Sequence, residues 1–171
     1  MTRLKIETGT ENPVLRKVAA PVKKVDKALL KLIQNMEQTM EDGKGCGLAA
    51  PQVNVSQRII IVKLNQQTDQ EIDLAMINPE IVFHSEETEV DTEGCLSVPK
   101  VFDLVRRYRD IIVKFKDKKG REQMLKLSEL NARVVQHEVD HLDGILFVDK
   151  LEKESPSPIA MLDRQERHLN L

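Results

Sequence analysis

Residues 128–144, SELNARVVQHEVDHLDG, predict the helix around which the rest of the fold is organised. Ser128 is a favourable N-terminal cap, and Gly144 marks a favourable end. Four side chains follow the i, i+4, i+7, i+11 spacing of one helical face: Leu130, Val134, His137 and His141. Both histidines are therefore expected to lie on the buried face of this helix.

The two histidines are spaced for metal binding. Positions four apart on a helix differ by about 40° in direction and by one turn in height, so His137 and His141 can direct nitrogens at one ion. Glu138 lies beside them, where a carboxylate can take a proton from water without binding the metal itself. Ordinary core or surface histidines are the alternative, but the pair at this spacing favours a metal site.

A third metal ligand has to come from another part of the chain, because a catalytic metal commonly takes three protein ligands and keeps one position for water. The candidates are Cys95, His84 and a carboxylate. Cys95 stands in EGCLSVP (93–99) after Gly94, and a glycine permits close backbone approach. Considered alone, Cys95 is better explained as a small buried apolar side chain.

The remaining elements predict an α+β fold. Residues 26–42 form an amphipathic pattern with Asp26 as cap and Gly43 as stop. Four segments have strand composition: 58–64, 74–83, 110–117 and 121–128, the last two forming a hairpin across 118–120. We expect mostly antiparallel β-sheets packed around a central metal-binding helix, with an N-terminal helix and a short C-terminal helix opening at Pro158.

Composition and charge exclude several classes of protein. The chain has 171 residues, 40% of them hydrophobic, which suits one soluble domain. The net charge of −2, with both signs intermixed, gives no footprint for nucleic acid. No apolar run suggests a signal peptide or a membrane span, so we expect a cytoplasmic protein that does not bind a membrane. With two cysteines, no structural disulfide is expected.

Three segments together resemble the signature motifs of the peptide deformylase family. They are GCGLAAPQ (45–52), EGCLSVP (93–99) and QHEVDHLDG (136–144), in the family's order and with its separations. Further similarity lies in NPVLRKVAAPV (12–22), INPEI (77–81) and GILFVDKL (144–151). The resemblance implies a single catalytic domain over residues 1–151. Residues 152–171 would then be a C-terminal tail, expected to be helical.

The resemblance also implies the site residues. The metal ligands would be Cys95, His137 and His141, with Glu138 as general base and acid. Gln52 and the backbone N–H of Leu96 would flank the oxygen of the scissile group, and Cys46, Gly47 and Gly94 would line the bound peptide. Leu130 and Val134, on the ligand face of the helix, are candidates for the wall of a methionine pocket; ordinary core residues are an equal alternative.

The implied reaction is removal of the formyl group from the N-terminal formyl-methionine of newly made polypeptides, with release of formate. Water activated by the metal would attack the formyl carbon while Glu138 handles the proton. The family uses one divalent metal, typically Fe²⁺, with Zn²⁺, Ni²⁺ or Co²⁺ as substitutes, whereas the ligand set alone suggests Zn²⁺. The substrates would be N-formylmethionyl nascent polypeptides. The tail either docks on the ribosome or caps the domain.

Two other functions stay open. A zincin-type metallopeptidase shares the His-Glu-x-x-His spacing but leaves the other two motifs unexplained. A non-catalytic, deformylase-like binding protein would be expected to lose Glu138 or a ligand first, and this chain keeps them.

Two positions depart from the family pattern. Cys46 replaces an aliphatic residue and is expected to line the pocket, because a fourth protein ligand would close the site to water. Phe102 stands where bacterial members often have arginine. One of the following arginines, Arg106, Arg107 or Arg109, could supply the missing contact to the substrate backbone, but arginines in such a run more often form a solvated face, which is the interpretation adopted here.

Overall fold

The computed structural model describes residues 2–152, so the expected tail, apart from Glu152, lies outside the described residues. In chain order the elements are α1 (Lys27–Asp42), β1 (Gly47–Ala49), the 3-10 helix η1 (Ala50–Val53), β2 (Ile59–Leu64), β3 (Ile72–His84), β4 (Thr88–Cys95), β5 (Val98–Tyr108), β6 (Asp110–Lys116), β7 (Glu122–Ser128), α2 (Glu129–Leu142) and the 3-10 helix η2 (Phe147–Lys150). Among these residues no helix is long and apolar enough to cross a membrane.

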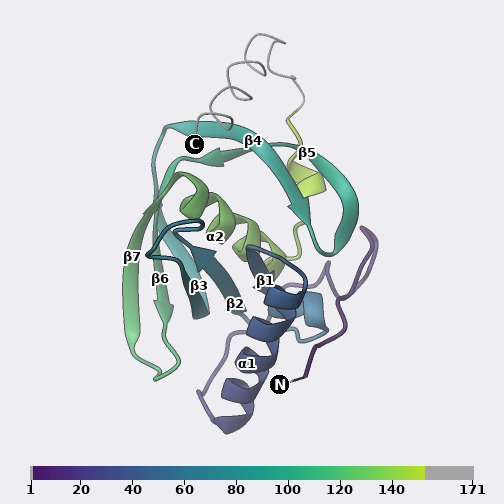
Figure 1. Cartoon of the computed structure of the whole chain (residues 1–171), viewed down its shortest axis with the longest axis vertical. Helices are drawn as coiled ribbons and strands as arrows, with labels where there is room; N and C mark the ends of the chain where they lie inside the picture. Colours follow the sequence, from purple (N-terminus) through teal and green to yellow (C-terminus); the bar gives the residue numbers. More distant parts are fainter. Residues whose placement is uncertain (1, 153–171) are drawn as a thin grey trace.

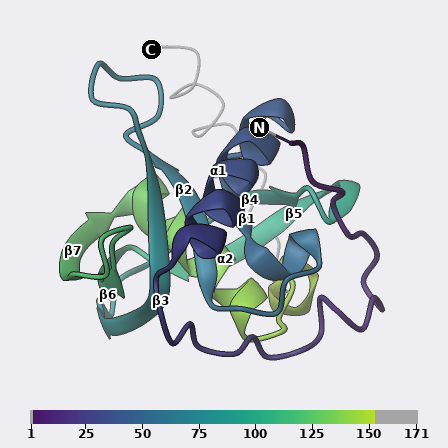
Figure 2. The ribbon, with the colours of Figure 1, turned by 90° about the horizontal axis from the view of Figure 1, so that it is seen from below.

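The strands form two antiparallel sheets, which confirms the expected α+β class. One sheet has the order β1-β2-β3-β6-β7, and the other is the hairpin β4-β5. In Figure 1, α2 lies in the middle of the molecule, with the β4-β5 hairpin passing over it. Figure 2 shows α1 lying across the larger sheet.

β2 is a strand without a solvent face. Ile59 and Ile61 pack in the cluster that includes the apolar residues of α1. Ile60 and Val62 pack in the cluster that includes those of α2. Because successive side chains of a strand point to opposite faces, this continuous apolar run packs against α1 on one face of the sheet and α2 on the other.

The helix α1 forms as the sequence predicts. The Asp26 side chain accepts a hydrogen bond from the Leu29 N–H at 2.9 Å, so it caps the first turn. The helix ends at Asp42, directly before Gly43. The apolar stripe of Leu29, Ile33, Met36 and Met40 is buried.

The helix α2 also begins and ends where the sequence predicts, but one detail differs. Ser128 stands at the N-cap position without a side-chain capping bond. Its hydroxyl donates instead to the Asp110 carboxylate across the β6-β7 pair. From Ala132 to Leu142 every residue of α2 is buried, so each of its polar side chains has to find a partner inside the protein.

Three strands have no counterpart among the sequence predictions. β1 has three residues, which is too short for a periodic signal. β4 and β5 form a separate two-stranded sheet whose side chains are mostly exposed or half-buried. They lack the apolar alternation that marks a half-buried strand. Their pairing runs to Cys95 and Val98, so the EGCLSVP motif is the turn of this hairpin.

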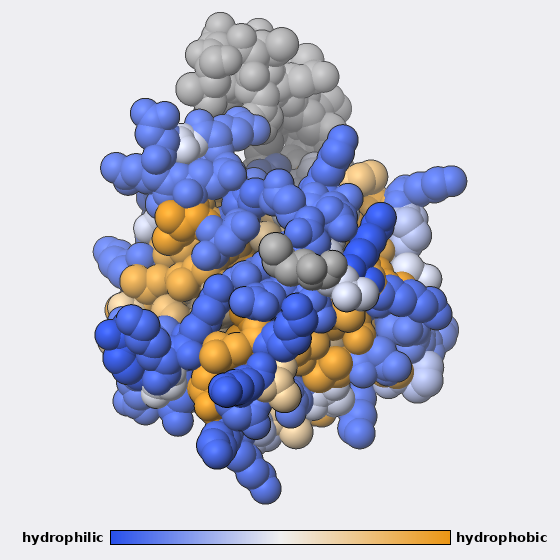
Figure 3. All heavy atoms as spheres, turned by 60° about the horizontal axis from the view of Figure 1, so that its bottom comes forward, coloured by the Kyte–Doolittle hydropathy of each residue, from blue (hydrophilic) through white to orange (hydrophobic). Residues whose placement is uncertain are grey.

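The surface is mainly hydrophilic. Figure 3 shows apolar residues gathered in patches between charged side chains on one face.

Substitution of Gly144, which follows the end of α2, is expected to reduce stability measurably. Its φ is +74°, and an added Cβ would lie 2.6 Å from the backbone oxygen of Arg16. A positive φ costs an L-residue roughly 1–2 kcal/mol, and backbone cannot move aside cheaply. Gly144→Ala is therefore expected to lower the free energy of unfolding by more than about 2 kcal/mol in urea titrations.

Gly120→Ala is the matched control. Gly120 has φ +76°, but its added Cβ meets only Val25, at 3.8 Å. The Gly120→Ala variant should lose only the free energy that a positive φ costs an L-residue, about 1–2 kcal/mol. Equal losses in the two variants would contradict the close approach of Arg16.

Candidate metal and active site

Three potential metal ligands converge from two elements. Cys95 ends β4, while His137 and His141 lie one turn apart on α2. Their ligand atoms all lie within 4.8 Å of one another, and Cys95 Sγ is 3.2 Å from His141 Nε2. Ligand atoms of a tetrahedral site with Zn–S and Zn–N bonds lie about 3.3–3.6 Å apart. One sulfur and two imidazoles at these separations fit a divalent metal.

Of the third-ligand candidates, the structure brings Cys95 to the histidines. His84 belongs to β3, where its ring stacks on Tyr108 with centroids 3.7 Å apart. Cys46 lies outside the ligand group as well. Its Sγ is 3.0 Å from Gln66 Oε1, at the edge of the pocket described below.

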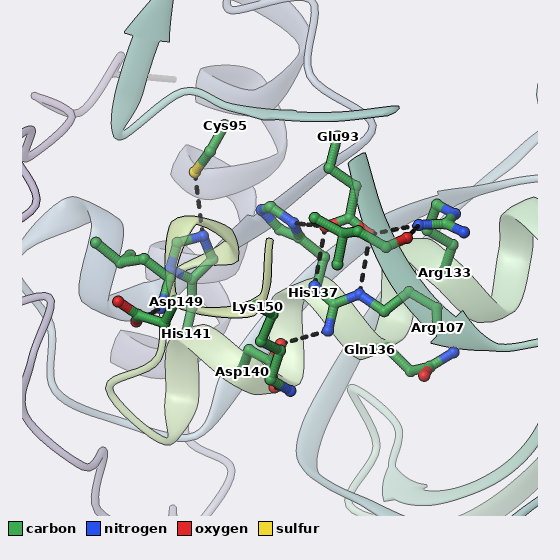
Figure 4. A network of polar contacts seen from close by, with 12 residues as sticks. Glu93, Cys95, Arg107, Arg133, Gln136, His137, Asp140, His141, Asp149 and Lys150 are labelled. Atoms are coloured by element: carbon green, nitrogen blue, oxygen red, sulfur yellow. Dashed lines mark hydrogen bonds and ion pairs between the residues drawn. The ribbon is translucent and has the colours of Figure 1, made fainter. Parts of the chain in front are cut away.

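Glu93 orients one of the imidazoles. Its Oε2 accepts a hydrogen bond from His137 Nδ1 at 2.8 Å. With Nδ1 occupied in this way, Nε2 of His137 is the nitrogen left for a metal. Figure 4 shows Glu93 and His137 side by side, with Cys95 and His141 adjacent.

Glu93 is the centre of a buried ionic network. Arg107 donates to both of its oxygens at 2.9 Å, and Arg133 donates to Oε1 at 2.8 Å. Arg107 also pairs with Asp140, which in turn accepts from Lys150 at 2.7 Å. Arg107 is 4% exposed, so the interpretation of this arginine as part of a solvated face is wrong.

This network sets the pKa values around the ligands. Burial would raise the pKa of Glu93, but hydrogen bonds from Arg107 and His137 hold it well below its usual range. Burial would lower the pKa of His137, but contacts with Cys95 and Glu93 raise it to about 10. His141, which lacks such a carboxylate partner, has a pKa lowered by burial and by the neighbouring His137. The two imidazoles are thus chemically different, and the contacts of His137 with Cys95 and Glu93 account for the difference.

Glu138 is a buried carboxylate with a free oxygen. Its Oε2 is fully enclosed and has no hydrogen-bond partner among the described residues. Burial raises the pKa of Glu138 to about 7. A carboxyl group with such a pKa can both accept and return a proton near neutrality. The backbone of Gly47, on β1, packs directly against this side chain.

Gln52 points its amide nitrogen at the ligand sulfur. Its Oε1 accepts from the Ala49 N–H at 2.7 Å, which fixes the orientation of the amide. Its Nε2 donates to Ser97 Oγ at 3.1 Å and lies 3.5 Å from Cys95 Sγ. Gln52 is therefore a donor held beside the candidate metal position.

A pocket of about 550 Å³ opens onto these groups. Apart from His141, which is fully buried, every site residue expected from the sequence lines it: Cys46, Gly47, Gln52, Gly94, Cys95, Leu96, Leu130, Val134, His137 and Glu138. Val134 is buried in the wall, whereas Leu130 is 51% exposed. The Leu96 side chain approaches Gly45, so the loop before β1 and the β4-β5 hairpin meet there.

Phe102 covers the backbone of the hairpin. It pairs with Gly94 across β4 and β5, and a Cβ on Gly94 would lie 2.4 Å from the ring. The ring is 72% exposed and lines the pocket. An apolar surface therefore stands where the resemblance suggested an arginine.

Sequence reasoning missed the side chains that hold the ligands in place. Glu93, Arg107, Arg133 and Asp140 were not predicted as a group. A signal was present, because Arg133 and Asp140 lie on a helix expected at the centre of the fold, where a buried charge requires a partner.

A thiol and two imidazoles beside a buried carboxylate, at the base of a pocket in an α+β fold, define the class of a candidate metal-dependent hydrolase. The sequence model of the polypeptide deformylase family matches residues 5–157. The peptide deformylase of Synechocystis sp. is 46% identical over 150 residues, which cover 88% of this chain and 78% of that protein. That of Desulfotalea psychrophila is 44% identical over 152 residues, 88% of this chain and 89% of that protein.

Solved structures agree with these sequence comparisons. The crystal structure of peptide deformylase from Thermotoga maritima has a TM-score of 0.84 at 41% identity, covering 89% of this chain and 99% of that one. A class I type b peptide deformylase from Acinetobacter baumannii, bound to Met-Ala-Ser, has a TM-score of 0.81 at 37% identity, covering 88% and 99%. The chain belongs to the peptide deformylase family and is an enzyme of that family, as the three motifs predict.

Gly47→Ala is expected to reduce activity sharply without unfolding the protein. The added Cβ would lie 2.3 Å from Glu138 Oε1, so the carboxylate has to move. A displacement of about 1 Å in a catalytic group can cost about 10²-fold in rate. The measurement is kcat/KM with a formylated peptide, beside the urea midpoint of the same sample. Unchanged kcat/KM would show that Glu138 is not held against Gly47.

Proposed function

We propose that this chain removes the formyl group from N-terminal formyl-methionine by hydrolysis at one divalent metal ion held by Cys95, His137 and His141. Deformylase activity follows from the family; the metal site and the residue roles are the proposal. The observation that carries it is the close grouping of these three ligands beside the unpartnered Oε2 of Glu138.

Bound there, the metal would polarise the formyl oxygen and lower the pKa of a water molecule. A thiolate ligand cancels one of the two metal charges, which leaves the activated water more nucleophilic than three neutral ligands would. We propose Fe²⁺ as the physiological metal, as the resemblance implies, with Zn²⁺, Ni²⁺ or Co²⁺ as substitutes.

Glu138 moves the proton. It accepts a proton from the attacking water and returns it to the departing amine, and its pKa of about 7 suits both steps. Gln52 Nε2 and the Leu96 N–H donate to the oxygen that becomes negatively charged. The loss of one such donor typically costs about 3–4 kcal/mol of barrier.

The pocket residues bind the substrate. Leu130 and Val134 form the wall for the methionine side chain, and Cys46, Gly47 and Gly94 lie along the peptide backbone. All five line the same pocket. The related enzyme from A. baumannii has been solved with Met-Ala-Ser bound, and we infer N-formylmethionyl nascent polypeptides as the natural substrates.

Formate release from formyl-Met-Ala-Ser, measured on anaerobically purified protein of known metal content, tests this proposal. We expect formate from this peptide and no cleavage of an internal peptide bond in a formyl-free peptide. His141→Ala should lose the metal, and His84→Ala, the matched control on β3, should keep it. Cleavage of the internal bond, or metal retained in His141→Ala, would contradict the proposal.

A further inference from the structure

The exposed residues that line the pocket mark its mouth, and they are Lys44, Cys46, Thr92, Pro99, Lys100, Phe102 and Leu130. The loop between α1 and β1 supplies Lys44, and the start of β5 supplies Lys100. Both lysines are exposed pocket residues, and each has a positive φ, at 53° and 66°. Two of the residues at the mouth of the pocket are therefore lysines.

Neither lysine is neutralised by the protein. In the part of the chain that the structure describes, neither forms an ion pair or a side-chain hydrogen bond. Three acidic residues stand within three positions of them in sequence, but Glu41 pairs with Lys63, and the carboxylates of Asp42 and Asp103 accept hydrogen bonds from Gln38 and the Leu104 N–H without contacting either lysine. None of these three acids lines the pocket.

The other charges of the pocket do not offset the lysines. Glu93 and Arg133 neutralise each other in the buried network. Glu138 is buried and, in the proposed function, transfers the proton. Lys44 and Lys100 are thus the charged residues that both line the pocket and are exposed, on a protein whose net charge is −2.

We propose that Lys44 and Lys100 select formylated peptides that carry an acidic side chain at the second or third residue. The inference rests on the proposed function, which places the formyl group at the ligands and the methionine side chain against Leu130 and Val134. The next residues of an extended peptide, spaced about 3.3 Å apart, then leave through the mouth. A carboxylate there meets two unpaired ammonium groups, whereas a lysine meets like charge.

The expected preference is modest and dependent on salt. An exposed ion pair is worth up to about 1 kcal/mol, or roughly fivefold, and two acting on one carboxylate give about three- to tenfold. The effect should appear in KM, because the charge is remote from the reacting atoms. It should shrink as ionic strength rises.

The experiment compares the metal-loaded enzyme on formyl-Met-Glu-Ala-Ser, formyl-Met-Ala-Glu-Ser and the versions with glutamine or lysine in place of glutamate. We expect kcat/KM to fall in the order Glu, Gln, Lys for at least one position, by about three- to tenfold between Glu and Gln. In K44Q/K100Q the Glu/Gln ratio should approach one. In K23Q/K24Q, an equal charge change on exposed lysines outside the pocket, the ratio should stay at its original value.

Each outcome decides the proposal. A Glu/Gln ratio of one in the unaltered enzyme, a preference for lysine, or a ratio that survives in K44Q/K100Q overturns it. Formate released from the glutamine peptides without charge preference would leave the proposed function intact. An enzyme that releases formate from none of the peptides would lose both.

Discussion

Glu138→Gln is expected to lower kcat for formyl-peptide hydrolysis by about 10²–10⁴-fold, the usual contribution of a general acid–base group. Glutamine keeps the size of the side chain but cannot accept the proton. Because Glu138 is not one of the three grouped ligands, the metal content should stay at its original level. Elemental analysis and kcat are to be measured on the same preparation.

Gln136→Glu is a useful control for the chemistry of this region. Gln136 is adjacent to His137 in sequence, but its amide bonds the backbone of Tyr108 instead of entering the pocket. A carboxylate placed there should not replace Glu138 when combined with Glu138→Gln. If Glu138→Gln alone retained full activity, the proton would have to move by another route.

Glu93→Ala is expected to cause the largest loss of stability, about 3–5 kcal/mol, the usual cost of removing one partner from a buried ion pair. Arg107 and Arg133 would remain buried without their shared carboxylate, and His137 Nδ1 would lose its acceptor. Urea unfolding of the metal-loaded protein measures the change. Asp149→Asn, which breaks the more exposed pair with Arg16, is the control and should cost at most about 1 kcal/mol.

The Glu93 carboxylate is also expected to make the stability of the protein depend on pH. Folding lowers the pKa of Glu93 from its unfolded value of about 4.3. Its stabilisation is therefore complete above that value and is lost as the pH falls below it. Stability of the unaltered protein should decline below about pH 4, and the decline should be shallower in Glu93→Ala. Parallel curves for the two proteins would contradict this role.

The sequence predicts the elements whose packing leaves a periodic trace. Asp26 and the stripe through Met36 define α1, and the apolar runs define β2, β3 and the β6-β7 hairpin. The β4-β5 hairpin left no such trace, because most of its side chains are not buried. Periodicity reports burial on one face, so a strand outside the main core is hard to predict from it.

The residues of the candidate site likewise fall into those that the sequence indicates and those that it does not. His137, His141 and Glu138 could be named as candidates because their spacing on a helix is itself a chemical pattern, whereas Cys95, on β4, was preferred among the candidate third ligands only through the family resemblance. The partners of Glu93 were not, since Arg107 is 14 residues away and Arg133 is 40. Such pairing is decided by how β5 and α2 pack, and no local pattern records it. The buried state of Arg107 is the clearest case.

The contrast between α2 and the hairpin bears on how this enzyme can evolve. Nearly every residue of α2 is enclosed, so a mutation there disturbs the chemistry and the interior together. Most of β5 faces outward, and a change at Lys100 or Phe102, which line the pocket, alters the entrance at little cost to folding. New substrate ranges can thus arise by drift along one exposed edge, while the reaction itself stays under strict selection.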